Sequence, residues 1–278
     1  MKLEPADLHL RLIPLADALA HETDDPAGVK ELAELLQRDG VLRNPIIVAE
    51  LEKQYAVLDG ATRVAALREL GLRDVLAQVV DYADASVQLS EWHHVIVGLA
   101  PNRLLAELAD VEGVTLHPVE AGVARRELAL RQILGCVVMN NGQHYAVLGE
   151  GPASIVQQAD LLRQLAEVYR STAEVHQTVE VDLTALATDY TGFAAVVMFP
   201  RFTPAEVAAL ALSPSKLPMN ITRHVIVGRA LGLDIPLDML GGGKSLDEKN
   251  AWLDALVHDR LRRNKVRMYQ EPVIVFDE

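Results

Sequence analysis

Two hydrophobic periods alternate along the first third of the chain. In PAGVKELAELLQRDG the apolar residues recur three and four positions apart, as in an amphipathic helix, and a glycine follows the last turn. NPIIVAEL, QYAVLD and DVLAQVVDY are short apolar runs typical of strands. The pattern predicts a compact α/β unit that ends near residue 85, with a helix over 26–40, strands over 44–51 and 54–59, a helix over 61–70 and a strand over 74–82.

The remainder of the chain predicts a larger α/β region. CVVMNNGQHYAVL indicates a hairpin, because Asn141-Gly142 suits a tight primed turn between two apolar runs. TPAEVAALAL begins with Thr203 and carries Glu206 three residues later, which is the pattern of a helical capping box. Further predicted elements are helices over 159–172 and 245–263 and strands over 193–199 and 271–278.

The stretch YAVLDGATRVAALRELG places an Asp-Gly turn directly between a strand and a helix. Such a turn gathers free backbone N–H groups at the positive end of a helix dipole, and Arg63 adds a fixed charge in the first helical turn. This arrangement suits an anion such as phosphate. A plain strand-turn-helix connection with an exposed arginine is the alternative.

Composition narrows the class of protein. The chain has 278 residues, of which 50% are hydrophobic and 23% charged, as in a globular protein with a substantial core. No apolar run reaches the roughly 20 residues that span a bilayer, and the N-terminus lacks the apolar core of a signal peptide. The single Cys136 excludes a disulfide framework and a cysteine metal cluster. These features favour the cytoplasm.

The charge balance argues against a nucleic-acid-binding protein. A net charge of −13 disfavours broad nucleic-acid binding, and an aromatic content of 4% disfavours base stacking. We expect no specific nucleic-acid partner and no membrane partner. The oligomeric state stays open, with a homodimer as one option.

The first 85 residues resemble the N-terminal domain of the ParB/sulfiredoxin-like superfamily. The resemblance runs through LAELLQRDGVLRNPIIVAELEKQYAVLDGATRVAALRELGLRDVLAQVV. ParB proteins continue with a helix-turn-helix domain, and the sequence after residue 85 shows no such helix pair. The turn also differs from the Gly-Glu-Arg-Arg type box of ParB partition proteins, and it has no cysteine, which sulfiredoxins need in this turn.

A closer resemblance is to the free L-serine kinases of this superfamily, and in particular to a bacterial branch associated with siderophore biosynthesis. The archaeal enzymes of this group have His-His in the turn where Ala61 and Thr62 stand here. The resemblance rests on four segments in their order and separation: HET at 21–23, LDGATR at 58–63, LPMNITRHVIVGRALGL at 217–233 and YQEPVIVFDE at 269–278.

This resemblance implies a fold and an activity. The α/β (α+β) fold would comprise a ParB/sulfiredoxin-like nucleotide-binding domain over residues 1–85, packed on a larger α/β domain over 86–278 that completes the substrate site. The enzyme would transfer a phosphoryl group from ATP or ADP to the hydroxyl of L-serine, with Mg²⁺ as cofactor. The product, O-phospho-L-serine, would serve siderophore or cysteine biosynthesis. A ParB-like regulator that binds DNA or a nucleotide without kinase activity is the alternative.

Glu22 and Asp59 are the catalytic candidates that the resemblance implies. Glu22 would be the base that accepts the proton of the serine hydroxyl; otherwise it is a solvated glutamate beside Asp24 and Asp25. Asp59 ends a predicted strand, where a carboxylate can hold Mg²⁺ together with phosphate oxygens. Simple turn formation is the alternative for Asp59.

Two further groups complete the predicted site. Arg223 would pair with a phosphate or a carboxylate, or else form an ordinary salt bridge. Adjacent strand residues face opposite ways, so we expect one of His93 and His94 to line the site and the other to be structural. The phosphate-binding candidates are Gly60, Ala61, Thr62 and Arg63, and the substrate-binding candidates are Trp92, His93, Thr222, Arg223 and His224.

Overall fold

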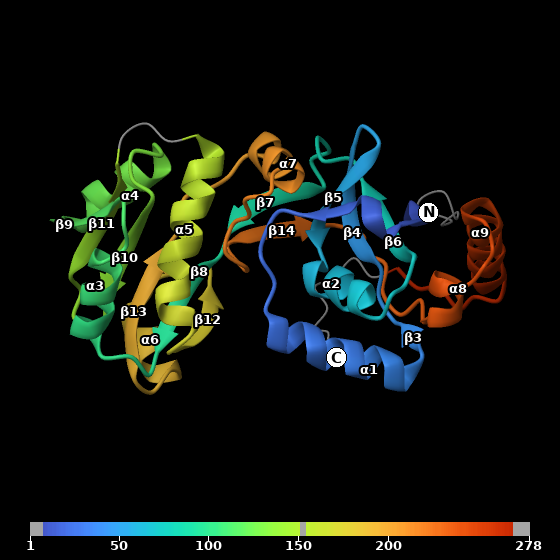
Figure 1. The fold of residues 1–278 in the computed structure, drawn as a ribbon, viewed down its shortest axis with the longest axis horizontal. Helices are drawn as coiled ribbons and strands as arrows, with labels where there is room; N and C mark the ends of the chain where they lie inside the picture. The colour runs from blue at the N-terminus through green and yellow to red at the C-terminus, as the bar shows by residue number, and fades with distance from the viewer. Residues whose placement is uncertain (1–7, 151–153, 269–278) are drawn as a thin grey trace. The chain divides into compact units, whose positions relative to one another are not determined.

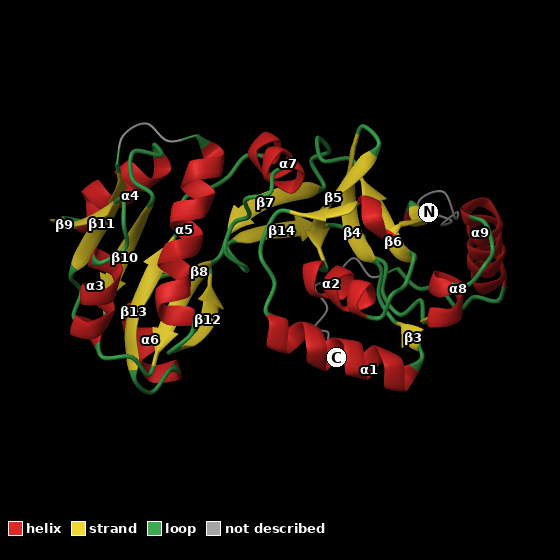
Figure 2. Cartoon of the chain, viewed as in Figure 1, coloured by secondary structure: helices red, strands yellow, loops and turns green. Residues whose placement is uncertain are grey.

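The computed structural model describes residues 8–150 and 154–268 and shows a mixed α/β fold, as the sequence predicts (Figures 1 and 2). The chain divides into two compact units. The first unit contains the described residues of Met1–Ala18, Pro26–Ser86 and Ile226–Glu278, and the second contains Leu19–Asp25 and Val87–Val225 without the undescribed 151–153. Within the described part of the chain, no helix is long and apolar enough to cross a membrane.

The first unit is built on a five-stranded sheet in the order β1-β6-β4-β5-β2, and the division between the units falls within β2, after Ala18. Strands β4 and β5 form an antiparallel hairpin, whereas β4 and β6 run parallel, with β5 and α2 between them in the chain. Helix α2 contacts both α1 and β4. The elements are β1 (Leu10–Pro14), a 3₁₀ turn (Leu15–Asp17), β2 (Ala18–Ala20), α1 (Pro26–Asp39), β3 (Val41–Leu42), β4 (Ile46–Leu51), β5 (Gln54–Asp59), α2 (Ala61–Glu69), β6 (Asp74–Val80), β15 (Ile235–Pro236), α8 (Leu237–Gly241) and α9 (Leu246–Arg262).

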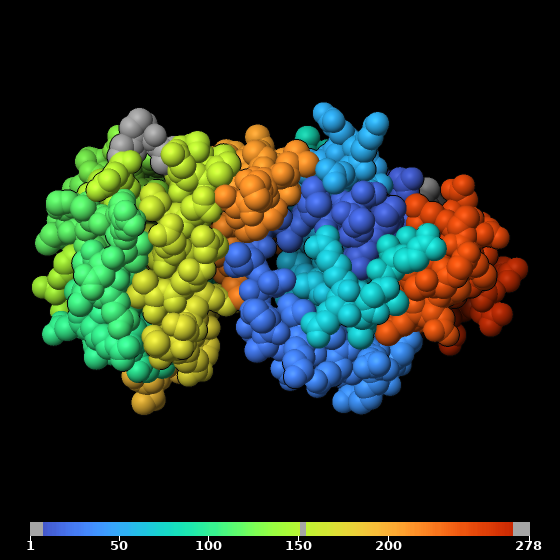
Figure 3. Space-filling model, viewed as in Figure 1, coloured from blue at the N-terminus to red at the C-terminus, as the bar shows by residue number. Residues whose placement is uncertain are grey.

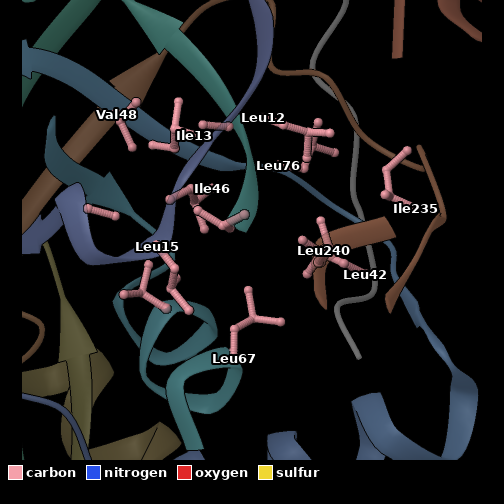
Figure 4. Packing of buried hydrophobic residues seen from close by; sticks show 14 of the residues in the cluster. Leu12, Ile13, Leu15, Leu42, Ile46, Val48, Leu67, Leu76, Ile235 and Leu240 are labelled. Atoms are coloured by element: carbon pink, nitrogen blue, oxygen red, sulfur yellow. The ribbon is translucent and has the colours of Figure 1, made fainter. Parts of the chain in front are cut away.

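The core of the first unit joins the N-terminal strands to the C-terminal helices. Leu12, Ile46 and Leu76 from the sheet lie in one buried cluster with Ile235 and Leu240 from the C-terminal segment (Figure 4). Figure 3 shows the side chains of α8 and α9, coloured orange to red, against the blue and cyan side chains of the same unit. The C-terminal segment therefore supplies part of the first unit's core.

This division differs from the predicted boundary at residue 85 in two segments. Residues 226–278 were expected in the second domain, but those that the structure describes belong to the first unit. The physical reason is the packing of α9 on β1, where the Asn250 side chain bonds both the N–H and the C=O of Leu12 at 2.8 and 3.0 Å. Residues 19–25, which carry Glu22, belong to the second unit because this segment pairs with Leu217.

The second unit is built on a six-stranded antiparallel sheet in the order β12-β8-β13-β10-β11-β9. Val95 and Val97 of β8 lie in a buried cluster with residues of α4 and α6, and His94 on the opposite face contacts Tyr169 of α5. Both faces of the sheet are therefore covered. The elements are β7 (Val87–Glu91), β8 (His93–Val97), α3 (Pro101–Ala109), β9 (Val114–Val119), α4 (Ala121–Ala129), β10 (Gly135–Met139), β11 (His144–Gly149), α5 (Ile155–Arg170), β12 (Glu174–Thr178), α6 (Leu183–Asp189), β13 (Phe193–Met198), α7 (Pro204–Leu212) and β14 (Thr222–Ile226), which pairs with β7.

Local sequence signals predicted several of these elements. The predicted hairpin is present as β10–β11, but its turn is not the primed type. Gly142 has a φ of +84°, which favours glycine, whereas Asn141 does not have the positive φ that a primed Asn-Gly turn needs. Thr203 and Glu206 form the predicted capping box at the start of α7. The predicted helix over 245–263 is confirmed as α9, while the strand predicted over 271–278 lies outside the described residues.

A buried ion pair connects α9 to the sheet of the first unit. The Lys249 ammonium donates to the Asp74 carboxylate at 2.5 Å and to the Leu240 carbonyl at 3.3 Å, and the side chains are 1% and 8% exposed. Removing one partner leaves the other charge buried, which costs about 3–5 kcal/mol in comparable pairs.

Lys249→Met should therefore lower the free energy of unfolding by about 3–5 kcal/mol, because it leaves Asp74 without its cation. Urea denaturation followed by circular dichroism measures this change. The matched control is Arg38→Met, at an exposed pair with Asp39, which should leave stability nearly unchanged. The double variant Lys249→Met with Asp74→Leu should recover most of the loss. A Lys249→Met protein as stable as wild type would contradict the assignment.

Candidate active site

The carboxylate of Glu22 is enclosed by backbone N–H groups of the second unit. Its Oε2 accepts a hydrogen bond from the Asn220 N–H at 2.8 Å. Its Oε1 accepts bonds from the N–H groups of Ile221 at 3.2 Å and Thr222 at 2.7 Å, and from the Thr222 hydroxyl at 2.5 Å. We call these four donors the Glu22 cage.

The backbone around residue 220 explains how consecutive N–H groups reach one carboxylate. Asn220 has a φ of +60°, and a left-handed residue within a turn directs successive N–H groups to the same side, as in anion-binding nests. An isolated β-bridge between Leu217 and Glu22 holds the two segments together, and the Thr23 N–H donates to the Leu217 carbonyl at 2.8 Å. The cage is therefore made by main-chain geometry.

Burial dominates the electrostatics of Glu22. The side chain is 12% exposed, and removal from water raises the pKa of its carboxyl above the ordinary value. The four hydrogen bonds of the cage oppose this shift without cancelling it. Neutral amides and a hydroxyl therefore stabilise the carboxylate only in part, and the pKa of the Glu22 carboxyl stays above that of an ordinary glutamate.

Two histidines support the cage. His94 is fully buried, and burial lowers its pKa to about 4, so the ring is neutral near pH 7. Its Nε2 lies 3.2 and 3.1 Å from the carbonyls of Met219 and Asn220 and must donate, while Nδ1 accepts from the Tyr169 hydroxyl at 2.8 Å. On the other side of the cage, the His21 Nε2 lies 2.7 Å from the Thr222 hydroxyl oxygen.

The structure places Thr222 and His93, two of the predicted substrate-binding residues, in the interior of the second unit. The Thr222 hydroxyl bonds inside the protein with Glu22 and His21, and Thr222 is the first residue of β14. His93 is 6% exposed, and its Nδ1 accepts a hydrogen bond from the Phe199 N–H at 3.3 Å. Both His93 and His94 are thus interior residues, because β8 is a central strand with two covered faces.

Arg223 and Trp92 form a partly exposed pair beside the cage residue Thr222. The Arg223 guanidinium lies over the Trp92 ring, 5.0 Å from its centroid, in the geometry of a cation–π contact. The ring of His224, the next residue of β14, meets the His21 ring edge to face at 5.7 Å. Arg223 and His224 are thus near the cage in sequence, and His224 is linked to it through His21.

The Asp59 turn, residues 59–63, lies in the first unit, and its carboxylate bonds charged guanidinium groups where Glu22 bonds neutral amides and a hydroxyl. Asp59 Oδ2 accepts from the guanidinium of Arg63 at 2.6 Å and from that of Arg229 at 2.5 Å. Arg63 also donates to the carbonyls of Asn44 at 3.3 Å and Pro45 at 2.6 Å. Arg63 is therefore anchored to the framework, whereas Arg229 reaches the same oxygen from the loop after β14.

Gly60 is required by the close packing of this turn. Its φ is +97°, and a Cβ at this position would lie 2.8 Å from the Ile46 side chain and 3.0 Å from the Arg63 guanidine. Gly60 is the N-cap of α2 and has no side chain that could accept a hydrogen bond. The N–H groups of Ala61 and Thr62, in the first turn of the helix, therefore receive no side-chain acceptor from the N-cap residue.

Two arginine guanidinium groups compete with the Mg²⁺ ion that the sequence predicts at Asp59. Both guanidinium groups already bond Oδ2, and the second carboxylate oxygen takes part in neither bond. Among residues 8–150 and 154–268, no three His, Cys, Asp or Glu side chains are grouped so that they could hold a metal ion by themselves. A Mg²⁺ ion here would need phosphate oxygens and water for most of its ligands.

Sequence reasoning named Thr222 but missed the cage donors Asn220 and Ile221 and the partner of Asp59, Arg229. Asn220 and Ile221 act through their backbone N–H groups, which carry no residue-type signal. Arg229 stands 170 positions from its partner, and only the flanking Gly228 and Gly232 mark its loop as a special conformation. His21 precedes Glu22 directly and was the one neighbour that the sequence could have singled out.

The chain is similar to several known proteins. Residues 8–91 match the family model of the ParB N-terminal domain. An ATP-dependent L-serine kinase of Staphylothermus marinus is 38% identical over 108 residues, which are 38% of this chain and 42% of that protein, so the match spans less than half of that relative. The ATP-dependent L-serine kinase SbnI of Staphylococcus aureus is 22% identical over 276 residues, which are 97% of this chain and 98% of that protein.

Two solved structures share the fold. The structure of SbnI with a C-terminal truncation from Staphylococcus aureus has a TM-score of 0.73 at 19% identity and covers 93% of this chain and 99% of that chain. A free serine kinase in complex with AMP has a TM-score of 0.71 at 19% identity and covers 84% of this chain and 94% of that chain. The chain therefore carries a region, residues 8–91, that matches the ParB N-terminal domain, and along most of its length it is similar to SbnI and shares the fold of these two solved structures.

Proposed function

We propose that the protein is an ATP-dependent L-serine kinase that converts free L-serine to O-phospho-L-serine. Two relatives named as ATP-dependent L-serine kinases support this activity, and the one from Staphylococcus aureus aligns with nearly the whole chain. These relatives favour the kinase over a ParB-like regulator and ATP over ADP as the donor. Use of the product in siderophore or cysteine biosynthesis stays a prediction.

The observation that carries the proposal is the environment of Glu22. Phosphoryl transfer to a hydroxyl needs a group that accepts the hydroxyl proton, and a carboxylate is a better proton acceptor when its pKa is raised toward the working pH. Burial raises the pKa of Glu22, and the cage holds the carboxylate in one orientation. Glu22 is therefore the group that we assign as the base.

The cage also distinguishes the two oxygens of Glu22. Oε1 receives three hydrogen bonds, two from N–H groups and one from the Thr222 hydroxyl, whereas the cage gives Oε2 one bond, from Asn220. Oε2 thus keeps a lone pair for a substrate hydroxyl. In the proposed step the serine oxygen forms a bond to the γ-phosphorus of ATP, its proton passes to Oε2, and the bond between the γ-phosphorus and the bridging oxygen breaks, releasing ADP.

Arg223 is the residue that we assign to the carboxylate of serine. A guanidinium binds a carboxylate through two parallel hydrogen bonds, and stacking on Trp92 restricts its plane. Trp92 would thereby orient Arg223 without touching the reacting atoms. His224 would border the same subsite. For His93, whose Nδ1 is already bonded to the backbone at Phe199, a direct substrate contact is the weakest part of the predicted set.

The Asp59 turn is the part that we assign to the nucleotide phosphates. Asp59, Arg63 and Arg229 together carry a net charge of +1, and the N–H groups of Ala61 and Thr62 add the positive end of the α2 dipole. Since Arg63 is anchored by two carbonyls, Arg229 is the guanidinium that can exchange Asp59 for a phosphate. Mg²⁺, when bound with ATP, would neutralise phosphate charge, and the second Asp59 oxygen is the protein atom that fits it.

If Glu22 is the base, the variant Glu22→Gln should lose most of its serine kinase activity. Wild-type protein with L-serine, Mg²⁺ and ATP should yield O-phospho-L-serine, detected by mass spectrometry, and D-serine should give much less. Glu22→Gln should lower kcat by about 10²–10⁴-fold, because an amide cannot accept the proton. Glu34→Gln, on an exposed face of α1, is the matched control and should behave as wild type. If Glu22→Gln keeps more than half of the activity, the assignment is wrong.

The nucleotide assignment predicts that the effect of Arg229→Gln depends on the number of phosphates. Titration calorimetry with Mg²⁺ should show ATP binding weakened by about tenfold or more and AMP binding little changed, since a charge-assisted hydrogen bond to a phosphate is lost. In the same titrations Asp59→Asn should weaken ATP binding with Mg²⁺ but not with EDTA. Arg38→Gln, at an exposed pair, is the control. Equal losses for AMP and ATP, or an unchanged metal dependence in Asp59→Asn, would refute these roles.

A further inference from the structure

The chain of hydrogen bonds behind Glu22 has a fixed direction. An ionised carboxylate only accepts hydrogen bonds, so the Thr222 hydroxyl must donate its single proton to Glu22 Oε1 across the 2.5 Å contact. The Thr222 oxygen then has only lone pairs left for His21. The His21 Nε2, 2.7 Å away, must therefore carry the proton and donate to Thr222.

The surroundings isolate this chain from water. His21 is 4% exposed and Thr222 is 8% exposed, and both belong to the second unit together with Glu22. The His21 Nε2 also lies 3.9 Å from Glu22 Oε1, too far for a direct hydrogen bond. Contact between the ring and the carboxylate thus runs through the Thr222 hydroxyl.

We propose that His21 is a positioning residue that acts on Glu22 through Thr222. Because His21 donates from Nε2 to the Thr222 oxygen, the Thr222 hydroxyl cannot donate its proton to His21 and donates it to Glu22. The hydroxyl is then held on Oε1, which keeps that oxygen occupied and leaves Oε2 to take the serine proton. His21 itself neither touches the substrate nor receives the proton, and this role rests on the proposed function.

This assignment gives the Thr222 side chain a role other than the substrate binding that the resemblance implies. A threonine hydroxyl has one proton to donate, and here Glu22 receives it. Its lone pairs are directed to His21. The Thr222 side chain therefore belongs to the support of the base, and Arg223 remains the group for the serine carboxylate.

Kinetics of paired variants test the proposal. His21→Phe keeps the ring shape but removes the donor, and Thr222→Val keeps the volume but removes the hydroxyl. Each should lower kcat by about 10- to 100-fold with an unchanged KM for ATP, the loss expected for a hydrogen bond in a chain that ends on a charged group. His21→Gln, whose amide nitrogen can reach the position of Nε2, and Thr222→Ser should restore most of the rate.

The double variant separates a chain from two independent contacts. In the proposed chain His21 acts on Glu22 through Thr222, and the phenyl ring of His21→Phe keeps the ring contact with His224. His21→Phe with Thr222→Val should therefore be no slower than Thr222→Val alone. His117→Phe, at an exposed position of β9, is the matched control and should leave kcat unchanged. Multiplicative losses in the double variant, or no rescue by His21→Gln, would overturn the proposal.

The tautomer of His21 gives a readout that does not depend on activity. Nitrogen-15 chemical shifts should show the proton of the neutral His21 ring on Nε2 in the wild-type protein, and the mixture of tautomers should increase in Thr222→Val. A proton on Nδ1 in the wild-type protein would overturn the proposal even if the kinase is active. Failure of the wild-type protein to form phosphoserine would instead refute the proposed function, whatever the tautomer.

Discussion

Burial of the Glu22 carboxylate is the constraint on which the second unit's site depends. A buried carboxylate is costly unless hydrogen bonds replace its water, and the protein supplies them from three consecutive backbone N–H groups and one hydroxyl. These N–H groups point to one carboxylate only because Asn220 has left-handed backbone angles and because neighbouring groups hold the backbone around it. His94 holds the Asn220 carbonyl, and Tyr169 holds His94. Hydrogen bonds thus connect the turn at Asn220 to His94 of β8 and to Tyr169 near the end of α5.

The two candidate carboxylates are stabilised by different means, and this difference separates their roles. Hydrogen-bond donors without a full charge surround Glu22, so burial dominates and the carboxyl stays basic. Asp59 instead bonds two guanidinium groups through one oxygen, which suits it to hold cations and the phosphates that compete for them. The proposed proton acceptor and the proposed anion site thus use the same type of functional group. The chemistry follows from the partners of each carboxylate.

The sequence predicted what depends on local residue order. The Asn141-Gly142 hairpin, the Thr203–Glu206 capping box and the strand-turn-helix at Asp59 are each written within a few neighbouring residues, and all three are present. The cage could not be predicted in the same way, because it joins Glu22 to backbone groups about 200 residues away and backbone N–H groups are the same in every residue type. The return of the C-terminal segment to the first unit was missed for the same reason. Packing of α9 against β1 depends on contacts between distant segments that no periodicity encodes.

Direct titration of the Glu22 carboxyl tests the central claim. The δ-carboxyl ¹³C resonance of Glu22, identified by its loss in Glu22→Gln, can be followed against pH in the protein without substrates. The account predicts a midpoint above the ordinary glutamate value of about 4.3, because burial disfavours the charged form more than the cage favours it. As the pH falls, Glu22 should then take up its proton before the exposed glutamates do. A midpoint at or below the ordinary value would contradict the account, since the cage would then hold a carboxylate too weakly basic to serve as proposed.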